Sequence, residues 1–227
     1  MVVAGVDGCK AGWIAFQVDI EARSSSLELI GLPGILQQRP SNLACLCIDI
    51  PIGLLDGSRA CDSAARQLLG WPRRNSVFSP PCREALAAKD YSDACTVNSR
   101  ITTKKMSQQA WGIAPKIRQV DDAIRTECQD WVYEVHPEVC FWAMAGKHPM
   151  EHRKKSVAGH NERLTLLRSV FDQIDGLLAN RPSGVGKDDL LDAAAAAWSA
   201  LRIARGAGQR VSEDQKDPLG LRACIWY

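Results

Sequence analysis

The sequence predicts an α/β protein in which one sheet of five strands is flanked by helices. Two observations support this class. Short apolar runs of strand length are concentrated in the first fifty residues, and longer helical patterns follow them. The chain has 227 residues, of which 46% are apolar, and this suffices for one core. We therefore expect a single domain over residues 1–227. The five expected strands are 2–6, 13–20, 27–32, 43–50 and 131–135.

The first strand, VVAGV at 2–6, is apolar throughout, as is typical of a central strand covered on both faces. Short turn-prone links separate it from the next two runs, so the first three strands should form an antiparallel meander. A short helix over 33–42 then leads to the fourth strand, which Pro51 ends.

Residues 56–128 are expected to form a mainly helical insertion. Between Arg59 and Arg118 there are eleven basic and four acidic residues, although the formal net charge of the whole chain is only +2. The insertion is therefore basic, whereas the rest of the chain is acidic overall. This balance gives no general attraction to nucleic acid but allows a local one. The expected helices of the insertion are 60–69, 83–88 and 115–127.

After the fifth strand, the polar stretch 147–159 predicts a loop. Apolar residues at helical spacing then predict one helix over 162–178. The final residues, LRACIWY, are expected to form a last short strand or a docked end.

The second helix of this part covers 186–205, with the sequence GKDDLLDAAAAAWSALRIAR. Asp188 precedes strong helix formers and is the expected N-cap. Asp189 and Asp192 are three residues apart and share a face with alanines. A face of small residues lets the helix lie close to a sheet, so both carboxylates should be directed into the protein.

Nine cysteines occur, an odd number, and no C-x-x-C pair is present. This pattern predicts a reduced, cytoplasmic protein without a structural zinc site. No run approaches the ~18–20 apolar residues of a membrane span, and the first residues lack the features of a signal peptide. We therefore expect no membrane partner.

Acidic residues recur at the ends of expected elements. Asp7 closes the first strand, Asp49 closes the fourth, and Glu134 lies near the end of the fifth. Together with Asp189 and Asp192 they form the predicted catalytic set. Such a cluster repels itself unless cations neutralise it, and hard oxygen ligands favour Mg²⁺ or Mn²⁺. We expect Asp7, Asp49, Asp189 and Asp192 to bind one or two ions, a device suited to phosphoryl displacement.

Several of these acids also have structural interpretations. An Asp-Gly pair at position 7 is in itself an ordinary turn. Glu134 is a metal ligand or the partner of a basic residue from the insertion. Glu138 follows Pro137, and we expect it to be solvated or to be a helix-start charge.

The insertion also offers candidates for substrate binding. Arginines and apolar residues are interleaved there, a pattern that suits phosphate contacts with stacking. A solvated helical face, turn and cap chemistry, and a structural histidine are the competing interpretations of these residues. The expected substrate-binding residues are Arg73, Arg74, Arg83, Ser107, Gln109 and Lys116, with His136, two residues from Glu134, as a general acid or base or a phosphate contact.

The order of elements and the acids on them resemble the ribonuclease H-like fold. The segments YEVHPEV and DDLLDAAAAA are similar to the end of bacterial Holliday-junction resolvases. Residues 5 to about 200 resemble the domain of unknown function 429 family, described as predicted ribonuclease H-like nucleases. Gln119 departs from that family pattern, which has an acid there. The motifs that carry this resemblance are GVDGCKAGW, IDIPIGL, CDSAARQLLG, RRNSVFSPPCR, SQQAWGIAPKIRQVD, EVHPEV and DDLLDAAAAA.

The resemblance implies a mixed sheet with three antiparallel strands followed by two parallel ones. It also implies a metal-dependent nuclease with a nucleic-acid or nucleotide substrate, and it leaves a homodimer open. Two other functions are compatible with the residues. One is a small-molecule phosphohydrolase or nucleotide-binding protein of the actin and sugar-kinase class, although no second glycine-rich phosphate loop is found. The other is a catalytically inactive nucleic-acid-binding protein.

Overall fold

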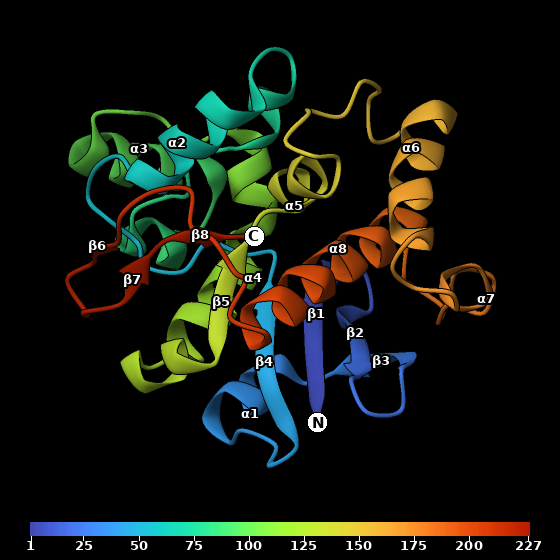
Figure 1. Cartoon of the computed structure of the whole chain (residues 1–227). Coiled ribbons are helices and arrows are strands. Elements are labelled where there is room, and N and C mark those ends of the chain that lie inside the picture. The colour runs from blue at the N-terminus through green and yellow to red at the C-terminus, as the bar shows by residue number, and fades with distance from the viewer.

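The computed structural model describes residues 1–227. Its main sheet consists of β1 (Val2–Cys9), β2 (Gly12–Asp19), β3 (Ser24–Ile30), β4 (Leu43–Ile48), β5 (Val132–Val135) and β8 (Ile225–Trp226). The strand order is β3-β2-β1-β4-β5-β8 (Figure 1). The first three strands are antiparallel, and β4, β5 and β8 run parallel to β1. This topology confirms the predicted mixed sheet of ribonuclease H-like class, and β8 adds a sixth strand.

Helices cover both faces of this sheet. On one face α5 to α8 pack over the strands, and on the other face α1 and α4 do so. Because β1 lies between these two layers, its Val3 enters one core and its Val6 enters the other. The helices are α1 (Leu32–Gln37), α2 (Ala60–Leu69), α3 (Tyr91–Thr102), α4 (Gln108–Ala123), α5 (Pro137–Met144), α6 (Val157–Arg168), α7 (Ile174–Ala179) and α8 (Lys187–Ala204).

Shorter elements complete the chain. Between β4 and β5 the chain runs through α2, two 3-10 turns, α3, α4 and a third 3-10 turn. The 3-10 turns are η1 (Arg73–Ser76), η2 (Arg83–Ala87) and η3 (Thr126–Asp130), and a small second sheet pairs β6 (Gln215–Lys216) with β7 (Arg222–Ala223).

Helix α8 lies directly on β1, as its alanine-rich face predicts. Residues 193–197, all alanine, are fully buried. Beneath them, a Cβ on Gly5 would lie only 2.0 Å from the backbone nitrogen of Ala197 and 2.1 Å from the carbonyl oxygen of Ala193. Only glycine on the strand and small residues on the helix permit this approach. The close contact brings the second turn of α8 to the end of β1 (Figure 1).

Two helix predictions require correction. The single helix expected over 162–178 is interrupted, because α6 ends at Arg168 and α7 begins only at Ile174. The helix expected over 115–127 begins earlier, at Gln108, because the Ser107 side chain accepts a hydrogen bond from the backbone N–H of Ala110. It contains Pro115 and ends at Ala123.

None of the helices combines the length and the apolar character that crossing a bilayer requires.

Candidate functional site

Three carboxylates from distant parts of the chain converge at one end of the sheet. Asp7 lies near the end of β1, Asp49 follows β4, and Asp192 lies in the second turn of α8. One oxygen from each lies within 4.8 Å of the others. Val6 of β1 pairs with Ile48 of β4 in parallel register, so the residues that follow them lie side by side. The contact between α8 and β1 then adds Asp192 to this pair.

Burial of these carboxylates opposes their ionisation. It is the main cause that raises the pKa of Asp7 well above its ordinary value, and the negative charges of Asp49 and Asp192 raise it further. Burial likewise raises the pKa of Asp49 to about 6. It raises that of Asp192 to about 7, against the opposing effect of Lys154. A set of mutually repulsive oxygen donors, two of them buried and one half-buried, fits a hard divalent cation, which would neutralise them.

Asp189 has a different position from the one we expected. Its carboxylate accepts a hydrogen bond of 2.8 Å from the backbone N–H of Gly186 and lies outside the converging group. Gly186, and not Asp188, is the N-cap of α8, so the prediction for Asp188 is wrong. Asp189 closes the first turn of the helix, and its charge still raises the pKa of Asp7.

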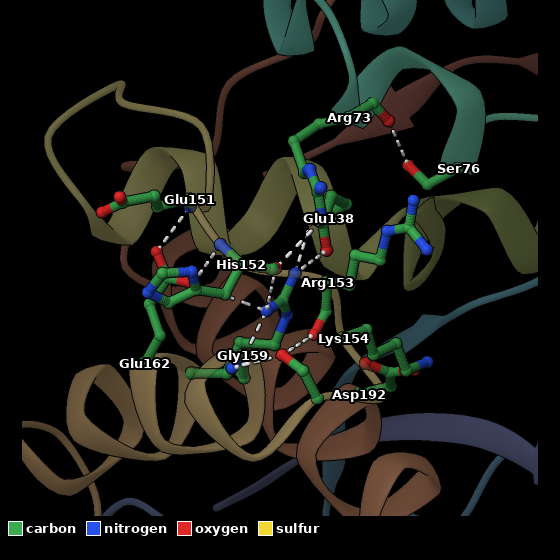
Figure 2. Close-up of polar contacts among 12 residues, drawn as sticks. Arg73, Ser76, Glu138, Glu151, His152, Arg153, Lys154, Gly159, Glu162 and Asp192 are labelled. Carbon is green, nitrogen blue, oxygen red and sulfur yellow. Dashed lines mark hydrogen bonds and ion pairs between the residues drawn. The ribbon is translucent and has the colours of Figure 1, made fainter.

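Lys154 is the one side-chain cation bound to this group. It lies between α5 and α6, and its Nζ forms an ion pair and a hydrogen bond with Oδ2 of Asp192 (Figure 2). Lys154 was not predicted from the sequence, since a lysine in a polar loop carries no local signal of a buried partner 38 residues away.

A pocket of about 170 Å³ opens beside the carboxylates. It is smaller than the roughly 300–1,000 Å³ of pockets that enclose drug-sized ligands, so it admits one small group or one unit of a polymer. Its walls combine apolar and polar residues. They are Asp7, Gly8, Asp49, Ile50, Pro51, Asp62, Val77, Phe78, Gln109, Ile113, Lys116, Glu134, Val135, His136 and Ile225.

Glu134 lines this pocket but is already paired with a cation. Its Oε2 accepts hydrogen bonds from Nη2 of Arg59 at 2.5 Å and from the backbone N–H of Ile52 at 2.8 Å. Burial raises the pKa of Glu134 to about 7, and Arg59 lowers it in opposition. Two roles were predicted for Glu134, as a metal ligand or as the partner of a basic residue from the insertion. In the structure Glu134 is the partner of such a residue, Arg59. Cys61, Asp62 and Glu134 form a second cluster of side chains whose ligand atoms lie close together. The cation in contact with this cluster is Arg59, which pairs with Glu134.

His136 and Asp62 bring unpartnered atoms to this pocket wall. Nε2 of His136 lies 3.3 Å from the carbonyl oxygen of Ser76, and its Nδ1 is buried without a partner. Burial lowers the pKa of His136, which favours the neutral ring. A neutral ring that donates from Nε2 leaves Nδ1 as an acceptor. Oδ2 of Asp62 is likewise buried and unpartnered, so these two residues of the pocket wall carry free acceptor atoms beneath its surface.

The sequence was compared with known families, curated proteins and solved structures. The profile of the family described as "Protein of unknown function (DUF429)" matches residues 5–217, nearly the whole chain.

The chain belongs to the DUF429 family.

No curated protein matches it. A solved structure titled "Thermus thermophilus RuvC structure" aligns over 91% of this chain and 98% of its own, with 16% identity and a TM-score of 0.35. The assignment of the fold follows from the strand order and directions of the sheet itself.

Three of the expected substrate-binding residues of this DUF429 chain reach the pocket: Gln109, Lys116 and His136. Nζ of Lys116 donates to the carbonyl oxygen of Gly12 at 2.5 Å and lies 4.6 Å from the ring centre of Trp13. These contacts hold its ammonium group beside Asp7 and Gly8, at the mouth of the carboxylate group.

The other four expected substrate-binding residues lie outside the pocket. Arg83 is taken up by ion pairs with Asp121 and Asp217, and Ser107 by the cap of α4. Arg73 donates to the carbonyl oxygen of His152 at 3.0 Å. The Arg74 side chain is exposed and makes no hydrogen bond or ion pair, so it is the most available of the three arginines for phosphate.

Glu138 is a further correction for the DUF429 chain. It lies in the first turn of α5, as expected of a helix-start charge, but it is buried and not solvated. Nη2 of Arg163 donates to both of its carboxylate oxygens, at 2.6 and 2.8 Å. Arg163 is itself 1% exposed, so this ion pair joins α5 to α6 in the interior.

Proposed function

We propose that this protein is a divalent-metal-dependent phosphodiester hydrolase that acts on nucleic acid, with Mg²⁺ or Mn²⁺ as its cofactor. The observation that carries the proposal is the convergence of Asp7, Asp49 and Asp192 at the end of the sheet. These residues come from β1, from the end of β4 and from α8. Two buried carboxylates and one half-buried carboxylate in one place are costly without a cation, and one lysine cancels only one of their charges.

Asp7, Asp49 and Asp192 would hold the ion, with Asp189 adding negative charge at the start of α8. A bound Mg²⁺ or Mn²⁺ supplies an activated water and stabilises charge on phosphoryl oxygens. Lys116 contributes an ammonium group to the pocket, where it can bind a phosphate oxygen. Phe78 lines the same pocket and offers an aromatic face to a base.

We also propose that the protein acts in the cytoplasm. All nine cysteines are free, and eight of them are buried. Unpaired cysteines in this number fit a reducing compartment. A homodimer stays an expectation that derives from the resemblance to resolvases.

Cleavage assays test the proposal. Labelled single-stranded, duplex, hybrid and branched nucleic acids are incubated with the protein in Mn²⁺, in Mg²⁺ and in EDTA. We expect cleavage that requires the metal and falls at least 100-fold in Asp7→Asn. The matched control is Asp172→Asn, which removes an exposed aspartate from the segment between α6 and α7 and should cleave normally. Absence of cleavage in all substrates, or equal cleavage by Asp7→Asn, contradicts the proposal.

The size of the pocket favours a second candidate, a small-molecule phosphohydrolase. A space of about 170 Å³ suits one nucleotide unit or a small phosphate ester. Release of phosphate from mononucleotides, with no cleavage of oligonucleotides, would favour this candidate. If Mn²⁺ does not bind in calorimetry, the catalytically inactive nucleic-acid-binding alternative is favoured instead.

A further inference from the structure

Lys154 contacts the cluster of three carboxylates formed by Asp7, Asp49 and Asp192. Its Nζ pairs with Oδ2 of Asp192, whose side chain is 3% exposed, and the Lys154 side chain is itself more than half covered. No other lysine or arginine forms an ion pair with Asp7, Asp49 or Asp192. The ammonium group therefore occupies one side of a donor set that would otherwise be open to cations.

The backbone before Lys154 is fixed by side chains from two other elements. The carboxylate of Glu162, in α6, accepts hydrogen bonds from the backbone N–H groups of Glu151 at 2.6 Å and His152 at 3.1 Å (Figure 2). The carbonyl oxygen of His152 accepts from Arg73, in η1, at 3.0 Å. It also accepts from the buried Arg163 at 3.3 Å. His152 thus has both its backbone N–H and its carbonyl oxygen bound, and Glu151 has its N–H bound.

The backbone next to Lys154 is held equally closely. Ser156 is the N-cap of α6, and its Oγ accepts from the backbone N–H of Gly159 at 3.0 Å and donates to the carbonyl oxygen of Arg153 at 2.8 Å. A Cβ on Gly159 would lie 2.0 Å from that same oxygen, so only glycine allows the helix to approach so closely. Lys154 therefore extends from a fixed segment and is not a freely moving surface lysine.

We infer that Lys154 takes the place of one of two metal ions, so that this centre holds a single divalent cation. The inference rests on the proposed function and specifies its metal content. Three carboxylates and one ammonium group leave two negative charges, which one Mg²⁺ or Mn²⁺ cancels. A second ion would have to share Asp192 with the ammonium group and would be repelled by it at contact distance.

The charges that flank the centre do not alter this balance. Asp189 is negatively charged and is bound to the Gly186 N–H, whereas Lys116 is positively charged and lines the pocket, so the charges of these two neighbours offset each other. The ion should therefore lie toward Asp7 and Asp49, the two acids that form no ion pair, and Asp192 should be shared between it and Lys154.

Isothermal titration with Mn²⁺ alone tests the inference, with electron paramagnetic resonance to detect coupled Mn²⁺ pairs. We expect one ion per chain in the wild type, and two ions with a coupled signal in Lys154→Met. Lys154→Gln serves as a second neutral variant, so that a folding defect of one substitution does not decide the result. Lys154→Arg, which keeps the charge, and Lys155→Met, which changes the exposed neighbour, should both bind one ion. Thermal unfolding confirms that each variant is folded.

The outcomes separate the inference from the proposed function. Two ions in the wild type overturn the inference and leave the metal-dependent hydrolase intact. One ion in both the wild type and the neutral variants also overturns it, because Lys154 then excludes nothing. Binding of no ion by any variant removes the proposed function together with the inference. If only the neutral variants bind Mn²⁺, Lys154 blocks the centre completely. That result overturns both the inference and the proposed function for the wild type.

Discussion

At the scale of single residues, the partner of each buried acid determines what that acid can do. Glu134 is paired with Arg59, and Glu138 with Arg163. Asp7 and Asp49 have no cationic side chain bound to them, although burial raises the pKa of both. The shortage of cationic partners is therefore local to the ends of β1 and β4, where the proposed metal ion would bind.

The raised pKa values of these acids predict how stability depends on pH. The pKa of Asp49 in the folded, metal-free chain is about 6, against an ordinary value near 4. Between these two values the folded state binds more protons than the unfolded state, so the free energy of unfolding falls as pH rises. Asp192, with a pKa of about 7, extends the same effect to neutral pH. Thermal unfolding in EDTA from pH 4 to 8 should show this loss.

Asp49→Asn provides the comparison for that measurement. The variant lacks one of the titrating groups, so its stability should fall less steeply between pH 4 and 6 than that of the wild type. In Mn²⁺ the free energy of unfolding of the wild type should instead rise with pH, because the ion binds the ionised carboxylates and stabilises the folded chain more as pH rises. A wild-type chain in EDTA that gains stability relative to Asp49→Asn over this range would contradict the pKa directions.

At the residue scale, the sequence selected acids at the ends of expected elements. Asp7 and Asp49 were selected as the closing residues of two strands and Asp192 from its place on the alanine face of a helix, and these three carboxylates lie together in the structure. Lys154 was not found, because its partner is brought to it only by the packing of α6 and α8. Asp189 was ranked with the ligands because its spacing from Asp192 is that of one helix face, but the first turn of a helix also needs caps.

At the scale of elements, the contact between β1 and α8 positions two of the three acids. Asp7 and Asp192 belong to elements that touch backbone to backbone at Gly5. Their separation is therefore set by main-chain packing and not by flexible side chains. The sequence predicted the small-residue face of the helix but gave no reason to select Gly5 on the strand.

Gly5→Ala should separate these two elements. The added Cβ would meet backbone atoms at 2.0 and 2.1 Å, so the helix must move, and we expect a loss on the order of 3 kcal/mol in the free energy of unfolding. Affinity for Mn²⁺ should fall as well, because Asp192 moves with the helix. Denaturant unfolding and calorimetry measure the two effects.

Gly112→Ala is the control for that substitution. It adds the same methyl group inside α4, where nothing lies within 4 Å, and it should be neutral or stabilise the helix by up to about 1 kcal/mol. If Gly5→Ala proves equally harmless, the close packing of α8 on β1 is not what positions the acids.

Element prediction failed where local patterns were weak. Helix α5 buries residues 137–142 in succession, so it lacks the polar face that marks a surface helix. Helix α3 is rich in Ser, Thr and Asn, which favour helices poorly, and its one signal is the cap in which Asp90 accepts from the N–H of Asp93. Strand β8 lies in the segment expected to form a last short strand or a docked end, but its pairing with β5 is set by tertiary structure.

At the scale of the whole molecule, residues 59–118 expose less positive charge than their sequence indicates, because acidic side chains from other segments pair with several of the arginines. Arg59 and Arg83 are neutralised by buried or half-buried acids, and Arg118 pairs with Asp122. The exposed positive charge that remains includes Arg74, in η1, close in sequence to the pocket residues Val77 and Phe78.

Arg74→Ala should therefore weaken oligonucleotide binding by a screened, sequence-independent contact. The measurement uses an Asp7→Asn background to suppress cleavage. The plot of the logarithm of the binding constant against the logarithm of salt concentration should become less steep by about one unit of slope. Arg205→Ala is the charge-matched control, since that exposed residue lies about 20 Å farther along α8 than Asp192. Equal slopes for Arg74→Ala and its parent would exclude this arginine from the binding surface.

The packing of α8 on β1 also fixes when the carboxylate group can form during synthesis. Asp7 is synthesised well before Asp192, with 184 residues between them. A contact across such a sequence separation must first offset a large loop-closure entropy. A growing chain therefore carries Asp7 and Asp49 but no complete carboxylate cluster until α8 has been synthesised and has docked on β1.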